Sequence, residues 1–464
     1  MENGDGEMFI GFSVSNFLSF KTTQTMSMIA SKVARHKQHI LMGNGKKVLK
    51  TGLIYGANAG GKSNFIKAID FSRDIILEGL EQVDLNKKYF RIDTSNYKVP
   101  GVFEYRLMTQ SGKEYSYGIA ISYAEKEIIS EWLIRIEKNG SETFVFNRDI
   151  NEDGENITES EIKYENREEA IRWQVYLEDF GKNISDPLKK KTILSDIAER
   201  SGKQVGIFKE ILDVYNWFQS IIILFPTSQY SGLNQMVEKE NVRQFFSKMM
   251  QYFDTGIMSV ESKQGPMDFD KIFEGIPAEY AEKLKIKISN DITNESVLCK
   301  VNNQIYSLKK DDDGNIITTK MMQNHGNGQD LFEYADESDG TKRLFDLIPL
   351  FYEHNGNRVI FIDEIDRSLH TNLTRRFLEL FYKFTERDNS QLIATTHDSN
   401  LLDLDLIRQD EIWFVERVKD QSSRMYSLNR YKERYDKRVD KEYLLGRYEA
   451  VPVFNEEFLE AINA

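Results

Sequence analysis

The sequence has almost no cysteine, no long apolar run and no excess of basic residues. Cys299 is the only cysteine among 464 residues, which excludes an intrachain disulfide and a cysteine-rich zinc site. The longest strongly apolar run, residues 221–225, is far too short to cross a bilayer. The acidic N-terminus does not have the pattern of a signal peptide. We therefore expect a cytoplasmic protein that contacts no membrane.

The charge balance is acidic, with a formal net charge of −13, which argues against a purely electrostatic grip on nucleic acid. A local basic face remains compatible with that total. With 40% hydrophobic and 29% charged residues, the composition is that of an ordinary globular protein. The length is sufficient for one large domain or for two smaller ones.

Residues 56–63 fit the pattern G-x-x-x-x-G-K-[ST] of a phosphate-binding P-loop. A short apolar stretch, residues 53–55, is expected to be the strand before the loop, and an amphipathic helix is expected after it. We expect the loop N–H groups to form an anion nest, Lys62 to contact the β- and γ-phosphates, and Ser63 to ligate Mg²⁺. No Asn-Lys-x-Asp motif for guanine is present, so ATP is favoured over GTP. The expected nucleotide-binding residues of the loop are Gly56, Asn58, Gly60, Gly61, Lys62 and Ser63.

A second part of the nucleotide site is expected far downstream. The apolar stretch 359–362 is typical of a buried parallel strand, and it ends in Asp363 and Glu364. Parallel strands place their carboxyl ends at the ligand crevice, so we expect Asp363 to hold the Mg²⁺ shell and Glu364 to act as general base. His397 follows another predicted strand, residues 391–394, from which it is expected to contact the γ-phosphate. The alternative for His397 is an ordinary surface-loop histidine.

Ser338 and Gly340 stand at the expected start of a helix that contains Leu344 and Leu347. Such residues either cap a helix or bind an anion there, and capping alone is a sufficient explanation. The functional alternative gains weight from the order of the motifs: P-loop, long insertion, Ser-x-Gly helix start, acidic strand and histidine.

This order resembles the layout of ABC-type ATPases, which include transporter nucleotide domains and SMC-like heads. The resemblance implies that Ser338 and Gly340 of one protomer cap the ATP bound to the P-loop of another, so that the chain forms a homo-oligomer. Residues 337–341 read Glu-Ser-Asp-Gly-Thr where transporters have Leu-Ser-Gly-Gly-Gln, which argues against a transporter.

Six segments more closely resemble the AAA-15 ATPases, which are RloA-type and abortive-infection ATPases of bacterial phage defence and include the AriA subunit of the PARIS system. The family's D-loop would correspond to residues 366–370, whereas no glutamine stands clearly at the position of a glutamine loop. The fold class that follows is α/β, an ABC/SMC-head-like P-loop ATPase with an antiparallel β subdomain and a helical insertion. The segments are 12–20, 55–63, 337–344, 363–370, 395–402 and 443–448.

The resemblance also implies a sensor or scaffold subunit that responds to a phage protein and controls a separate toxic effector, such as a TOPRIM-type nuclease. Roughly 65 residues follow His397, fewer than a typical domain needs, so we expect the effector on another polypeptide. One alternative is a RecF- or SMC-like repair ATPase bound to DNA, which the acidic charge disfavours. Another is a scaffold that binds ATP without turnover, which Glu364 and His397 disfavour.

Hydrophobic periodicity indicates a strand meander over 99–148, helices over 168–256, and strands over 257–323. Polar connections are expected at 35–47 and 149–168. The three aspartates 311–313 are interpreted as a hairpin turn with Gly314 rather than as a metal site. The predicted divisions are 8–148 (N-terminal ATPase half with P-loop and meander), 149–256 (helical insertion), 257–329 (β-rich segment), 330–416 (C-terminal ATPase half) and 417–464 (C-terminal tail).

Two basic clusters remain open in interpretation. The tail region 430–443 interleaves lysines and arginines with tyrosines and acids, which suits nucleic acid, an acidic partner or a solvated face, and the mixed charge favours the last. The same alternatives apply to Lys189–Lys191. Asp403 and Asp405 form a D-x-D pattern on an expected loop or helix, so we do not expect a metal there.

Overall fold

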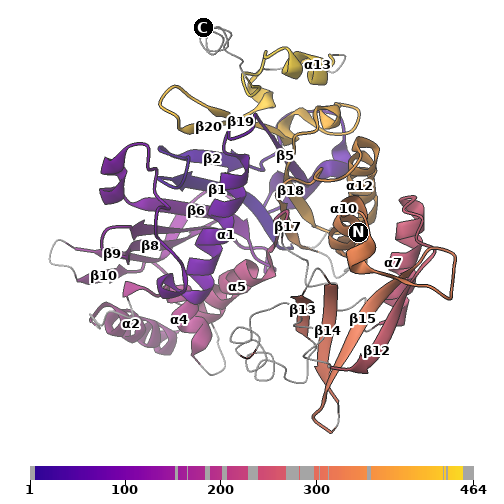
Figure 1. The fold of residues 1–464 in the computed structure, drawn as a ribbon. Coiled ribbons are helices and arrows are strands. Elements are labelled where there is room, and N and C mark those ends of the chain that lie inside the picture. The colour runs from indigo at the N-terminus through magenta and orange to yellow at the C-terminus, as the bar shows by residue number, and fades with distance from the viewer. Residues whose placement is uncertain are drawn as a thin grey trace, which may run out of the picture. The chain divides into compact units, whose positions relative to one another are not determined.

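The computed structural model divides into two compact units (Figure 1). Unit 1 comprises residues 1–226, 356–365 and 378–464, and unit 2 comprises residues 227–355 and 366–377. These units are interleaved along the chain, so the divisions drawn from periodicity remain a sequence-based prediction. The structure describes residues 6–452 except 152–154, 165, 183–188, 201–205, 228–238, 268–281, 283–296, 302–303, 312, 353–356, 432 and 435–436.

A six-stranded sheet in unit 1 carries the motif-bearing strands, in the order β11-β17-β18-β5-β19-β20. All its neighbouring pairs are parallel except β19 and β20. Every residue of β5, β17 and β18 is buried, as expected for parallel strands covered on both faces. The strands are β5 Thr51–Tyr55, β11 Ile222–Leu224, β17 Val359–Ile362, β18 Gln391–Thr395, β19 Ile412–Arg417 and β20 Ser423–Ser427.

The predicted meander is part of a seven-stranded antiparallel sheet, in the order β10-β9-β8-β7-β6-β1-β2. Burial alternates along β6, because successive side chains of a strand point to opposite faces. The strands are β1 Met8–Ser15, β2 Gln24–Ser27, β6 Gly101–Met108, β7 Glu114–Ser122, β8 Glu127–Ile136, β9 Glu142–Ile150 and β10 Asn156–Glu159.

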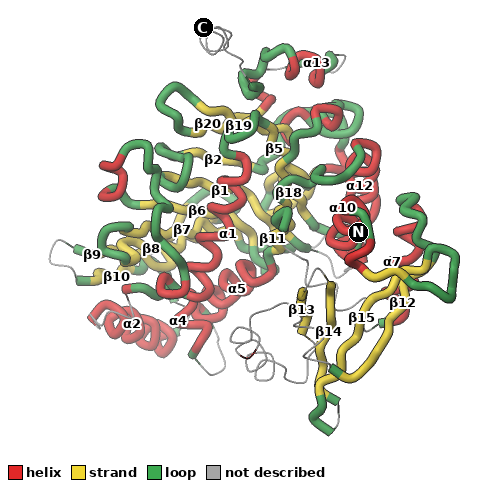
Figure 2. Tube along the Cα trace, viewed as in Figure 1, coloured by secondary structure: helices red, strands yellow, loops and turns green. Residues whose placement is uncertain are grey.

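Residues of the helices α1, α2, α4 and α5 of unit 1 share one hydrophobic core with residues of both sheets. Figure 2 draws the helices in red and the strands in yellow. Phe65 of α1 packs edge-to-face on Phe12 of β1, and Phe9 of β1 packs the same way on Phe361 of β17. None of the helices among the described residues is long and apolar enough to span a bilayer. The helices of unit 1 are α1 Lys62–Glu78, α2 Arg167–Lys182, α4 Ile193–Glu199, α5 Ile207–Ser220 and α13 Val439–Leu444.

Three strand regions differ from the sequence-based expectation. The segment expected as a polar loop at 35–47 contains the hairpin of β3 Ile40–Gly43 and β4 Lys46–Leu49, which turns at Asn44 and Gly45 with positive φ at both. Asn-Gly is a strong hairpin signal, and it was missed because the flanking strands are only four residues long. Strand β10 lies in the expected connection 149–168, and β11 lies within the expected helical region.

Unit 2 combines a small antiparallel sheet with helices. Its strands pair in the order β12-β15-β14-β13, and β16 pairs with β15. In the described part of 257–323 this agrees with the expected strands, whereas residues 268–281 and 283–296 lie outside the described residues. The elements are α7 Glu240–Tyr252, β12 Ser259–Pro266, β13 Val297–Val301, β14 Gln304–Lys310, β15 Ile316–Asn324, β16 Phe332–Glu333, α10 Asp339–Leu347, α11 Pro349–Tyr352 and the start of α12 Thr371–Phe384, which ends in unit 1.

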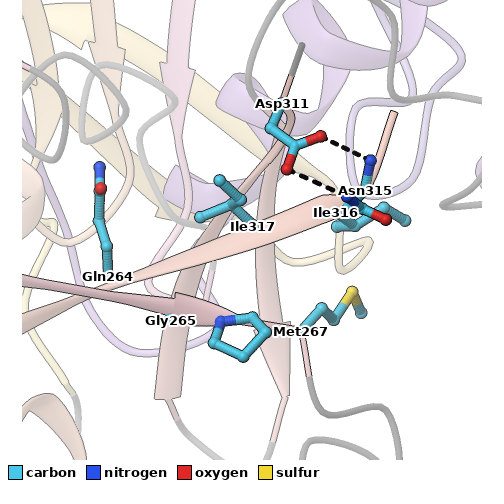
Figure 3. Close-up of a pocket in the computed structure, with 8 residues that line it drawn as sticks. Gln264, Gly265, Met267, Asp311, Asn315, Ile316 and Ile317 are labelled. Atoms are coloured by element: carbon cyan, nitrogen blue, oxygen red, sulfur yellow. Dashed lines mark hydrogen bonds between the residues drawn. The ribbon is translucent and has the colours of Figure 1, made fainter. Parts of the chain in front are cut away.

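Asp311 closes the turn between β14 and β15, as Figure 3 shows. Its carboxylate accepts hydrogen bonds from the Asn315 backbone N–H at 2.7 Å and from the Asn315 amide at 3.3 Å. Gly314 has a φ of 84° in this turn. Among the described residues, no group of three or more histidine, cysteine, aspartate or glutamate side chains is arranged to hold a metal ion. The hydrogen bonds of Asp311 and the conformation of Gly314 agree with the turn interpretation, whereas Asp312 lies outside the described residues.

Candidate nucleotide site

The P-loop spans the gap between the end of β5 at Tyr55 and the start of α1 at Lys62. Gly61 has a φ of 117°, and a Cβ at this position would lie 2.2 Å from the Ser423 hydroxyl. Only glycine therefore fits there without strain. Asn58 is exposed, whereas Ser63 is half-buried at the second position of α1. The strand-loop-helix context expected for the P-loop is confirmed.

The Lys62 ammonium points back into the loop. It donates hydrogen bonds to the carbonyl oxygens of Gly56 at 2.7 Å and Ala57 at 3.1 Å, and the residue is only 4% exposed. A buried ammonium needs such acceptors, because an unpaired buried charge is costly. The loop thus keeps one cation at its centre, where anionic phosphate oxygens would be attracted.

A serine-based hydrogen-bond network, which we call the loop support, holds the P-loop from outside. The Ser423 hydroxyl donates to the Gly60 carbonyl at 2.6 Å and lies 2.8 Å from the Ser19 hydroxyl. Asn64 of α1 donates to the Ser19 hydroxyl at 2.8 Å, and the Ser423 backbone N–H donates to the Ser19 carbonyl at 2.7 Å. Sequence reasoning assigned no role to these residues, since they are far apart in the chain.

Asp363 and Glu364 follow β17 directly and are held by Thr395 at the end of the neighbouring strand β18. The Thr395 hydroxyl donates to Asp363 Oδ1 at 2.6 Å and accepts from the Glu364 N–H at 2.7 Å. Asp363 is 3% exposed. Glu364 has a φ of 51°, a left-handed conformation that is costly for a residue with a side chain and is concentrated at functional sites.

The sheet order explains why these residues lie near the P-loop. Strand β18 pairs on one side with β17 and on the other with β5, all in parallel. The carboxyl ends of the three strands therefore meet at one edge. The Thr396 N–H donates to the Ile54 carbonyl at 3.1 Å, which ties the end of β18 to the strand that enters the P-loop.

His397 lies two residues beyond the end of β18 and is exposed. Its position after β18 brings it to the same sheet edge as the P-loop and the acidic pair. Contact with a γ-phosphate stays a prediction for this residue, as do the roles assigned to the other site residues.

Ser338 and Gly340 lie in unit 2, at the start of α10. The Ser338 hydroxyl accepts a hydrogen bond from the Thr341 N–H at 3.1 Å, so it is the N-cap of the helix. A Cβ at Gly340 would lie 2.8 Å from the Ser368 carbonyl oxygen. The signature segment thus packs closely on the segment 366–370, which the resemblance assigns to the D-loop.

Both basic clusters are largely ion-paired among the described residues. Lys189, Lys190 and Lys191 each lie within 3.5 Å of a carboxylate, those of Glu127, Glu81 and Glu199. In the tail, Lys437 pairs with Glu433, Arg438 with Asp440, and Arg447 with Glu433 and Glu442. These pairs suit a solvated face better than a surface held open for phosphate groups.

The fold and the loop together define an α/β protein with a P-loop between a buried parallel strand and a helix. The family described as "AAA domain, putative AbiEii toxin, Type IV TA system" matches residues 53–160 and 185–403, which is more than half of the chain. The chain therefore belongs to this family. No curated protein matches the sequence.

Similar solved structures include an SMC head domain from Thermotoga maritima, with 13% sequence identity and a TM-score of 0.34. That match covers 90% of this chain and 98% of the head domain. A second is the recombination mediator protein RecF with ATP, with 13% identity, coverage of 91% of this chain and 98% of RecF, and a TM-score of 0.32.

Proposed function

We propose that the chain is a Mg²⁺-dependent ATPase that assembles through ATP held between protomers and controls a separate toxic effector in anti-phage defence. The observation that carries the catalytic part is the Thr395 hydroxyl, which binds Asp363 and Glu364 together at the sheet edge shared with the P-loop. A chain that only held nucleotide would not need a strained glutamate there.

Mg²⁺ suits the oxygen donors of this edge, because it prefers hard oxygen ligands and commonly takes only one or two from the protein. Ser63 and Asp363 would hold it. The Thr395 hydroxyl fixes one oxygen of the Asp363 carboxylate at this sheet edge. When bound, the metal would neutralise charge on the phosphate oxygens.

The reaction assigned to the site is hydrolysis of ATP to ADP and phosphate. Glu364 accepts a proton from a water as that water's oxygen forms a bond to the γ-phosphorus. The bond between the γ-phosphorus and the β–γ bridging oxygen breaks, and ADP leaves with the electron pair. Lys62 stabilises charge on the phosphate oxygens, and His397 contacts the γ-phosphate and responds to its loss.

In the assembly, Ser338 and Gly340 of one protomer contact the nucleotide bound to the P-loop of another. ATP binding and hydrolysis then switch the oligomer between states that retain or release the effector. The effector class, a TOPRIM-type nuclease, and the phage-protein trigger rest on the resemblance to AAA-15, RloA-type and AriA-like ATPases. The matched family's description, which names a toxin and a toxin–antitoxin system, supports a role of this kind.

Glu364→Gln tests the chemistry. We expect turnover to fall by about a thousandfold, the range of a lost general base, while ATP affinity stays within about threefold. Phosphate release gives the first value and fluorescent-ATP titration the second. Glu142→Gln is the matched control, since Glu142 is an exposed glutamate at the start of β9. Equal turnover in Glu364→Gln and in the unchanged protein would refute the proposed role of Glu364 as general base.

Co-expression with the neighbouring gene tests the biological part. We expect native mass measurement to give an oligomer that holds a second protein, and we expect phage infection or Lys62→Ala to change how much of that protein is retained. A lone chain whose hydrolysis is stimulated by DNA, with a salt-sensitive DNA complex, would instead identify a repair ATPase.

A further inference from the structure

Two adjacent leucines at the end of α13 are exposed to solvent. Leu444 is 65% exposed and Leu445 is 82% exposed, the highest value for a large apolar side chain among the described residues. Single exposed apolar residues are normal on protein surfaces, whereas two adjacent exposed leucines present a contiguous apolar surface to water. The α13 tip is our name for these two leucines.

The α13 tip stands on a firmly packed base. Tyr443 stacks on Phe414 with ring centroids 5.6 Å apart, and Tyr448 stacks on Phe414 at 5.3 Å. The Tyr443 hydroxyl donates to the Ala450 carbonyl at 3.1 Å. Arg447 pairs with Glu433 and Glu442, both at 3.0 Å. The leucines are therefore presented by an ordered segment, which lowers the entropy cost of covering them.

This base touches the P-loop. Tyr443 packs edge-to-face on Tyr55, the last residue of β5, with ring centroids 6.1 Å apart. Burial raises the pKa of Tyr443 to about 12, and a hydrogen bond from the Gly56 backbone N–H opposes part of that increase. Gly56 is the first residue of the P-loop, so the base of α13 contacts the start of that loop (α13 is labelled in Figure 1).

We propose that the α13 tip, Leu444 and Leu445, is an apolar anchor that a second copy of this chain covers in the ATP-bound assembly. The inference rests on the proposed function, because ATP held between protomers requires each copy to cover the surface around the other's P-loop. The setting fits an interface, with an apolar centre and the ion pairs of Arg447 at its rim. In a twofold assembly each copy contributes one α13 tip to the interface, so a substitution there removes two apolar contacts from each dimer.

The test uses the full chain with Glu364→Gln as the parent, which is expected to stay ATP-bound. Sedimentation velocity with Mg²⁺-ATP measures assembly of the parent, of a Leu444→Ser/Leu445→Ser variant, and of a matched control. The control is Ile171→Ser/Val175→Ser, a pair with 51% and 53% exposure on α2. We expect assembly about 100-fold weaker in the leucine variant and unchanged in the control.

Two further measurements distinguish whether a second copy, the same chain or the effector covers the α13 tip. ATP affinity at a concentration too low for assembly should stay within about twofold, and the melting temperature without ATP should not change, because the leucines are exposed in one copy. A clearly lower melting temperature without ATP would overturn the proposal in favour of a cover from the same chain. Normal assembly with lost binding of a co-expressed effector would overturn it in favour of the effector.

The remaining outcomes separate this proposal from the proposed function. A parent that assembles with ATP while the leucine variant assembles equally well overturns the anchor alone. A parent that stays monomeric with ATP overturns both the anchor and the ATP-held assembly.

Discussion

The two parts of the candidate site differ in how their residues are held. In unit 1, Asp363 and Glu364 are positioned by Thr395 of the neighbouring strand β18. The P-loop is held by Ser423 of β20. In unit 2, Ser338 is engaged by its own helix, where it caps the N-terminus. Preorganised groups supply catalysis without rearrangement, whereas the Ser338 hydroxyl must share or leave its cap to meet a ligand. Under the proposed function, the P-loop part would act without rearrangement, whereas Ser338 would have to change its hydrogen bonding on assembly.

Of these substitutions, Lys62→Ala should reduce ATP binding at the P-loop the most. The ammonium is the buried cation at the centre of the loop, and a hydrogen bond to a charged group is among the stronger kinds. We expect ATP affinity to fall by about 100-fold and turnover to be undetectable, with fluorescent-ATP titration as the measurement. Lys67→Ala, at an exposed lysine of the same helix, is the control. Unchanged affinity in Lys62→Ala would refute the assignment of the P-loop.

Thr395→Val should loosen the acidic pair while keeping the shape of the side chain. It removes the hydrogen bonds to Asp363 and Glu364, so we expect kcat to fall by about 10- to 100-fold with little change in KM. Thr374→Val is the matched control, because the Thr374 hydroxyl is buried with no hydrogen-bond partner among the described residues. Turnover in Thr395→Val as fast as in the control would mean that the threonine does not position the acids.

Variants of Ser338 should distinguish a capping role from a role in binding ATP, and they should have the smallest effect of the three sets of variants. Ser338→Ala removes the cap and should lower the free energy of unfolding by about 1 kcal/mol, whereas Ser338→Asp keeps a good cap. If Ser338 also meets the ATP of a second protomer, Ser338→Asp should prevent ATP-driven assembly by placing a carboxylate against phosphate. Denaturant unfolding gives the first value and sedimentation the second. Normal assembly in Ser338→Asp would leave only the capping role.

Much of the fold class was accessible from the sequence, for a physical reason. The P-loop pattern, the fully apolar strand 359–362 and the alternating strands after residue 99 are local signals, because periodicity follows directly from strand and helix geometry. The α/β class, with a P-loop between a buried parallel strand and a helix, was predicted correctly. Weak local signals failed: β11 has three residues, and the β3–β4 hairpin has strands of four residues each.

The sequence by itself determined which chemical groups are present and at which strand ends they stand, since those depend on residue type and local pattern. Only the tertiary structure decided which groups hold them. Four segments from distant parts of the chain lie against β5 and its loop. They are β18 with Thr395, β20 with Ser423, the segment after β1 with Ser19, and α13 with Tyr443. Contacts between residues hundreds of positions apart leave no periodic trace in a single sequence, because they depend on sheet order and packing rather than on neighbouring residues.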